Sequence, residues 1–203
     1  MANQLDVKKQ IDVVFSIANT LRGTYQPDKY RDVILPMIIL RRIECALADT
    51  RDIVYEAYEA NHDIAEVILQ RKSGYPFYNT SKWTLAKLLG DAPQLPINLT
   101  TYIDAFSPNI KQIFSDLEFD KEIKKMHKGA KLTGVVRKFS ELDLDPAHVN
   151  NVAMGYMFEE VIRRFSENAE AGDHYTPREV VQLITRLVLT EGCDDLKAPG
   201  KVI

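Results

Sequence analysis

The sequence predicts a mainly α-helical fold. Apolar residues recur at three- and four-residue steps along most of the chain, which is the spacing of one face of a helix. Stretches that alternate strictly between apolar and polar residues, as half-buried strands do, are missing. The chain has 203 residues, of which 45% are hydrophobic and 27% charged, a composition typical of a globular domain rather than a disordered segment. We therefore expect a multi-helix domain.

The first 70 residues are expected to form three or four helices. Gly23 should end the first helix, and the second should begin near Asp28, after Pro27. Pro36 lies inside the second helix and is expected to kink it. The segment from Ile53 to Leu69 fits one further helix or two. The apolar faces of the first two helices are Val7, Ile11, Val14, Phe15, Ala18 and Leu21, and Tyr30, Val33, Ile34, Met37 and Ile38.

Residues 71–100 are rich in glycine, proline and asparagine, which favour turns. One short helix, from about Ser81 to Leu89, fits between these turns. Thr80 is its expected cap, and Trp83 is expected to lie inside it.

Helical spacing resumes after residue 100. Asp145-Pro146 predicts the start of a helix, because aspartate caps well and proline suits the first helical position. The apolar stripe that follows is wide, so we expect a central, largely buried helix. The faces in this part of the chain are Ile110, Ile113, Phe114 and Leu117; Leu132, Val135, Val136 and Phe139; and Val149, Val152, Ala153, Tyr156, Met157, Val161, Ile162 and Phe165.

Charge is unevenly distributed. The net charge of −3 excludes a strongly basic protein as a description of the whole chain. Residues 121–138 nevertheless carry seven lysines and arginines against one acid. This stretch is either a solvated helical face or a patch that contacts DNA phosphates. The candidate DNA-binding residues are Lys121, Lys124, Lys125, Lys128 and Lys131. The pairs Arg41-Arg42 and Arg163-Arg164 are expected to cap helices or pair with acids instead.

Several kinds of chemistry have no signature in the sequence. Two cysteines cannot supply a disulfide framework or a four-ligand zinc site, and the four histidines are scattered. Gly-x-Gly is missing, and Gly129 and Gly134, although spaced as in a phosphate loop, lack the Lys-Ser/Thr that must follow. We predict no catalytic residue and no metal site. Without a signal peptide or a span-length apolar run, the chain is expected to be soluble and cytoplasmic, with no membrane contact.

The most informative segment lies near the C-terminus. Thr176 and Glu179 have the spacing of a capping box, and Pro177 suits the first helical position. Such a helix start offers free N–H groups to an anion or carboxylate. An amphipathic face is expected to follow at Val180, Leu183, Ile184, Leu187 and Val188.

Residues 172–181, Gly-Asp-His-Tyr-Thr-Pro-Arg-Glu-Val-Val, resemble the Gly-x-Phe/Tyr-Tyr/Phe-Thr-Pro-Arg motif of DNA adenine-N6 methyltransferases. In particular, the segment resembles the modification (M) subunit of type I restriction-modification enzymes. Residues 18–23 with 29–42, and residues 154–165, resemble two further stretches of that subunit's N-terminal region. The likeness therefore covers essentially the whole chain.

The resemblance implies a helical N-terminal domain over residues 1–168 and the truncated start of a Rossmann-like α/β methyltransferase domain over residues 169–203. The family's later Gly-x-Gly loop and Asn-Pro-Pro motif are absent, so an inactive N-terminal fragment of a longer subunit is expected. It should carry only part of the S-adenosylmethionine site, with Tyr175 and Thr176 contacting the cofactor's amino-acid portion. His174 stands where the family usually has an aromatic residue. The implied cofactor residues are Asp173, His174, Tyr175, Thr176, Pro177 and Arg178.

The implied partners are a specificity subunit, a second M subunit, a restriction subunit and double-stranded DNA. The whole subunit would transfer a methyl group from S-adenosylmethionine to adenine N6, after the base is flipped out of the duplex. The alternative is a stand-alone helical adaptor that binds protein or nucleic acid and has no catalytic role.

Overall fold

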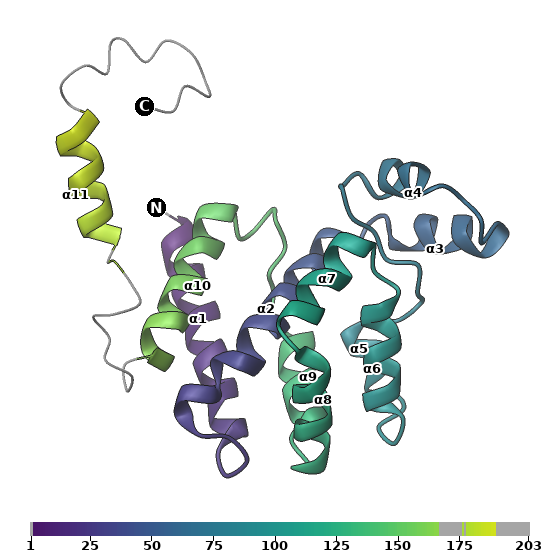
Figure 1. Cartoon of the computed structure of the whole chain (residues 1–203), viewed down its shortest axis with the longest axis horizontal. Coiled ribbons are helices and arrows are strands. Elements are labelled where there is room, and N and C mark those ends of the chain that lie inside the picture. Colours follow the sequence, from purple (N-terminus) through teal and green to yellow (C-terminus); the bar gives the residue numbers. More distant parts are fainter. Residues whose placement is uncertain (1, 167–175, 177, 190–203) are drawn as a thin grey trace. The chain divides into compact units, whose positions relative to one another are not determined.

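The computed structural model describes residues 2–166, 176 and 178–189. Within these ranges the chain consists of helices and loops, with two isolated bridges and no strand (Figure 1). The prediction of a mainly α fold is confirmed. The chain divides into two compact units, Met1–Phe165 and Ser166–Ile203.

The first two helices follow the predicted pattern. Helix α1 spans Ala2–Leu21, and Gly23 follows it with a φ of +84°, a conformation that glycine adopts without steric cost. A 3-10 turn, η1, spans Pro27–Lys29 where the second helix was expected to begin, and α2 spans Arg31–Ala46. Pro36 lies within α2, which continues past it.

Helix α2 forms the centre of the first unit. Figure 1 shows it running between the pair α1 and α10 and the group α5 to α9. Its inner face contributes Val33, Ile34, Met37, Ile38 and Leu40 to the main hydrophobic core, each with no measurable exposure.

The segment from Ile53 to Leu69 forms two helices, the second of the two expected possibilities. Helix α3 spans Arg51–Ala60 and α4 spans Glu66–Ser73, and the two pack against each other. They have a small core of their own, made of Val54, Leu69 and Tyr78.

The prediction for residues 71–100 was partly wrong. The short helix is α5, Leu85–Leu88, and Thr84 rather than Thr80 caps it by accepting a hydrogen bond from the Lys87 N–H at 3.1 Å. Trp83 therefore precedes the helix instead of lying inside it. A further helix, α6, spans Leu95–Asp104 and has a proline in its first turn, where the missing N–H costs nothing.

Three helices follow in quick succession. Helix α7 spans Pro108–Asp116, α8 spans Phe119–Lys128 and α9 spans Leu132–Ser140. Ile110 and Phe114 of α7 are buried as expected, whereas Ile113 and Leu117 are partly exposed. The face of α9 is buried at all four predicted positions, Leu132, Val135, Val136 and Phe139.

Helix α10 spans Asn151–Ser166 and begins later than predicted. Asp145-Pro146 opens a turn in which the Asp145 carboxylate accepts the Ala147 N–H at 2.7 Å. Asn150 caps the helix, because its side-chain oxygen accepts the Ala153 N–H at 2.9 Å.

The expectation that this helix is largely buried was also wrong. One face of α10 is buried at Ala153, Met154, Met157 and Val161, but Val152 and Tyr156 are 62% and 44% exposed. Near its end Phe165 packs on the rings of Phe15 in α1 and Tyr30 beside α2. Helix α10 is therefore an amphipathic outer helix.

The described part of the second unit is Thr176 and helix α11, Arg178–Leu189. The predicted C-terminal helix is thus present, while Pro177 lies outside the described residues. The apolar side chains described on α11 are Val180, Val181, Leu183 and Ile184, which are all exposed.

Candidate nucleic-acid interface

Most of the predicted cofactor segment lies outside the described residues. This holds for Asp173, His174, Tyr175 and Pro177. Thr176 is exposed and lies just before α11, and Arg178 is the first residue of that helix, although its side chain is not among those described. The assignment of these six residues to a cofactor site therefore stays a prediction.

The five predicted DNA-binding lysines lie on α8 and in the turn that follows it. Phe119, Ile123 and Met126 of α8 are buried in the core. Because residues three and four apart share a helical face, the lysines between these positions point outward. Lys121, Lys124, Lys125 and Lys128 are exposed, and Lys131 is half-buried.

Two of these lysines already have a carboxylate partner. Lys121 pairs with Glu118, a hydrogen bond that raises the pKa of Lys121. The ammonium of Lys124 lies 3.3 Å from the Asp120 carboxylate. Such exposed pairs add about 0–1 kcal/mol to stability, but each cancels a positive charge at the start of α8.

Lys125 is engaged differently. Its ammonium lies over the ring of Tyr25, 4.0 Å from the ring centroid. The Tyr25 hydroxyl donates to the backbone carbonyl of Glu122 at 3.3 Å. Burial and the neighbouring Glu122 raise the pKa of Tyr25, so the ring stays neutral and attracts the cation. This interaction attaches α8 to the loop between α1 and α2.

Four further cations follow in the same stretch. Lys128 is the last residue of α8, and Lys131 immediately precedes α9. In the last turn of α9, Arg137 is exposed and the Lys138 ammonium donates to the Ser16 carbonyl at 3.2 Å. The basic stretch is therefore not one uniform face.

The pair Arg41-Arg42 is built into the fold. The Nε of Arg41 donates to the Leu142 carbonyl at 2.7 Å, and a guanidinium nitrogen of Arg42 donates to the carbonyls of Leu144 and Val149 at 2.8 and 2.6 Å. Partial burial lowers the pKa of Arg42. Both arginines hold the loop between α9 and α10 against α2, which agrees with the structural role expected for this pair.

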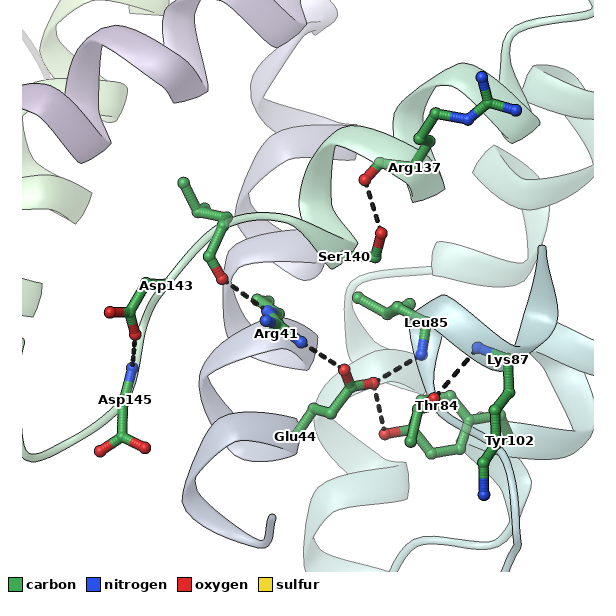
Figure 2. Close-up of polar contacts among 11 residues, drawn as sticks. Arg41, Glu44, Thr84, Leu85, Lys87, Tyr102, Arg137, Ser140, Asp143 and Asp145 are labelled. Carbon is green, nitrogen blue, oxygen red and sulfur yellow. Dashed lines mark hydrogen bonds and ion pairs between the residues drawn. The ribbon is translucent and has the colours of Figure 1, made fainter.

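Sequence reasoning missed a buried polar cluster around Glu44, an acid in the apolar helix α2. Figure 2 shows its carboxylate between three donors. One oxygen accepts from Arg41 at 2.5 Å, and the other accepts from the Leu85 N–H at 2.7 Å and the Tyr102 hydroxyl at 3.0 Å. Burial, with the Glu44 charge, raises the pKa of Tyr102 well above its usual value. A carboxylate so fully bonded joins α2, α5 and α6 rather than acting on a substrate.

The pair Arg163-Arg164 is also engaged. Both arginines bond the carboxylate of Glu160, at 2.8 and 2.6 Å. The guanidinium of Arg164 also lies over the ring of Phe15, 4.1 Å from its centroid. The two ion pairs lie within α10, and the contact of Arg164 with Phe15 joins α10 to α1.

A cleft of about 200 Å³ lies between α6, α7 and α8. Its lining is mixed: apolar side chains stand beside the polar Thr100 and Ser115 and the charged Asp104, Lys111 and Asp120. Among the described helices, none combines the length and apolarity that a membrane crossing requires.

The chain was compared with known proteins. The family model described as the HsdM N-terminal domain matches residues 12–139, well over half of the chain. The match runs from within α1 to the end of α9 and includes all five candidate lysines. The comparisons with curated proteins and with solved structures gave no match.

Proposed function

We propose that this chain is the docking part of a DNA adenine-N6 methyltransferase. The premise is that the chain belongs to the HsdM N-terminal domain family and so is the N-terminal region of a type I restriction-modification M subunit. The observation that carries the proposal is the match over residues 12–139, which covers most of the helical first unit, Met1–Phe165. In this view residues 1–168 form the docking domain and residues 169–203 begin the catalytic domain.

The whole subunit would transfer a methyl group from S-adenosylmethionine to the exocyclic N6 of adenine. Chemistry on a stacked base requires the base to be flipped out of the duplex into the active-site pocket. The chemical step is assigned to parts of the subunit beyond these residues. The helical unit contributes by holding the DNA and the partner subunits.

The second unit would supply one edge of the cofactor site, from Asp173 to Arg178. Thr176 is exposed two positions before the start of α11, a helix of 12 residues. The N–H groups at a helix start and a neighbouring hydroxyl suit the carboxylate of the cofactor's amino-acid portion. S-adenosylmethionine supplies the methyl group when bound.

The first unit would dock on the specificity subunit and lie against the DNA with the basic stretch of α8 and α9. Several cations here lie near the surface, and clustered lysines bind DNA phosphates by releasing counterions. A second M subunit and the restriction subunit would complete the assembly, in the cytoplasm. The specificity subunit would read the DNA sequence.

The test is a methyl-transfer assay with the complete subunit. The subunit, co-purified with its specificity subunit, is incubated with duplex DNA and S-adenosylmethionine, and N6-methyladenine is measured by mass spectrometry. We expect N6-methyladenine only when both subunits are present. Absence of methylation from a folded two-subunit complex that binds duplex DNA would favour the non-catalytic adaptor instead.

A further inference from the structure

Two close approaches hold the turn between α8 and α9, and the first turn of α9, against the end of α1 and the loop that follows it. A Cβ placed on Gly129 would lie 2.6 Å from the Thr24 side chain, and one on Gly134 would lie 3.3 Å from the Thr20 methyl group. Neither glycine has a positive φ, so both serve close approach rather than an unusual backbone. Their phosphate-loop-like spacing is thus explained by packing.

This packing brings basic residues from distant parts of the sequence to one end of the first unit. Arg22 follows α1 directly and is exposed, in the same loop as Thr24. Lys128 and Lys131 flank Gly129. We call Arg22, Lys128 and Lys131 the basic tip.

The cations of the basic tip differ from those at the start of α8 in having no carboxylate partner among the described residues. In the described part of the chain, no carboxylate lies within 4.0 Å of the side-chain nitrogens of Arg22, Lys128 or Lys131. Lys121 and Lys124, in contrast, are each paired with an acid one turn away. A phosphate that binds a paired lysine must compete with its carboxylate, whereas an unpaired lysine only gives up counterions.

The backbone at the basic tip adds hydrogen-bond donors and partial positive charge. Helix α9 starts here, and the first N–H groups of a helix have no intrahelical acceptor. The helix dipole places partial positive charge at this end of α9. Lys128 also lies at the C-terminal end of α8, where a cation stabilises the helix itself. A test must therefore separate DNA binding from stability.

We propose that the basic tip, rather than the outer face of α8 with Lys121 and Lys124, contacts the sugar-phosphate backbone of duplex DNA. The inference rests on the proposed function and adds Arg22, which lies about 100 residues away in the sequence from the lysines it joins. Because these contacts are made to phosphates, they hold the duplex without reading its sequence.

The experiment compares the tip variant Arg22→Gln/Lys128→Gln/Lys131→Gln with the face variant Lys121→Gln/Lys124→Gln. Both are made in the complete subunit assembled with its specificity subunit. The dissociation constant for a labelled duplex is measured by fluorescence anisotropy over a range of salt concentrations. In the tip variant we expect the slope of log K against log salt to become less steep by about 0.9 for each phosphate that the protein no longer neutralises. The face variant should keep the wild-type slope.

A matched control removes three cations elsewhere, in Arg71→Gln/Lys72→Gln/Lys82→Gln. These side chains are exposed on α4 and the loop before α5. Thermal unfolding of every variant reports stability separately. The control should keep the wild-type slope; an equal change there would assign the effect to net charge and overturn the proposal.

The remaining outcomes separate the inference from the proposed function. A slope change in the face variant alone would overturn the assignment to the basic tip and leave a DNA contact by this domain standing. An unchanged slope in both variants would remove the DNA contact from this region altogether. The proposed methyltransferase activity is decided independently, by the mass-spectrometric assay.

Discussion

At the scale of single residues, charged side chains in this domain divide into those that build the fold and those that the proposed function assigns to DNA. Arg41, Arg42 and Glu44 belong to the first kind, since each bonds groups from distant segments. The sequence indicated this for the arginines, because they adjoin an apolar stripe. It could not indicate the role of Glu44, because two of its three donors come from residues 41 and 58 positions away.

The first prediction concerns this buried carboxylate. Replacing Glu44 by Gln leaves the Arg41 guanidinium without its charge partner. The new side-chain amide also points its N–H₂ group, a donor, at a donor that the carboxylate oxygen accepted from. We expect a loss of about 3 kcal/mol in the free energy of unfolding, because the remaining half of a buried pair is uncompensated. Tyr102→Phe removes only one hydrogen bond and should cost about 1 kcal/mol.

Urea unfolding followed by circular dichroism measures both variants against the parent chain. The prediction requires that Glu44→Gln loses more unfolding free energy than Tyr102→Phe. If Glu44→Gln unfolded at the same urea concentration as the parent chain, the carboxylate would not stabilise the packing of α2, α5 and α6.

At the scale of helices, three- and four-residue periodicity located most of the elements, and local signals misplaced several ends. Thr80 and Asp145 are both good caps in sequence, but Thr84 and Asn150 make the capping bonds. Thr80 instead donates from its hydroxyl to the Ala105 carbonyl at 3.2 Å, a partner supplied by tertiary structure. Several residues in a row can cap, and packing decides which one does.

The width of an apolar stripe also misled the prediction for α10. Val152 and Tyr156 extend the stripe in the sequence, yet both side chains are exposed. The helix is fixed instead through its buried face and through Arg164 and Phe165 at its end. The sequence shows which side chains of the helix are apolar. Which of them are buried depends on the elements that pack against the helix.

The pH dependence of α10 provides the second prediction. Hydrogen bonds from Arg163, and then from Arg164, hold the pKa of Glu160 below its ordinary value of 4.5, although partial burial opposes them. A carboxyl whose pKa is lowered by folding stabilises the fold above its unfolded pKa and loses this contribution as the pH falls through its folded pKa. Glu160→Gln should therefore be less stable by about 0.5–1 kcal/mol near neutral pH, and equal to the parent well below pH 4.5.

The measurement is the free energy of unfolding of both chains from neutral to acidic pH. Glu141→Gln, which removes an exposed acid after α9, is the matched control and should stay within about 0.5 kcal/mol of the parent at every pH. A stability gap for Glu160→Gln that persisted unchanged at the lowest pH would show that the effect comes from packing rather than charge.

At the scale of the whole molecule, the chain consists of a helical body with its own core and a second unit that begins at Ser166. The lysines of the body were visible in the sequence as a charge run. The pairs Lys121–Glu118 and Lys124–Asp120 span only three and four positions, so helical spacing already suggests them. The position of Lys128 and Lys131 beside the end of α1 was not visible, because it depends on the packing of Gly129 against Thr24. Arg22 joins the lysines only through the fold.

The central claim is that the helical body serves assembly and DNA holding, while methyl transfer belongs to the domain that follows it. Its most direct test is deletion of residues 1–165 from the complete subunit, followed by measurement of N6-methyladenine formed with the specificity subunit present. We expect the shortened subunit to bind S-adenosylmethionine as the parent does and to methylate DNA at a rate reduced at least about a hundredfold, since correct positioning of the substrate contributes at least this much. Methylation at the parent rate by the shortened subunit would contradict the account.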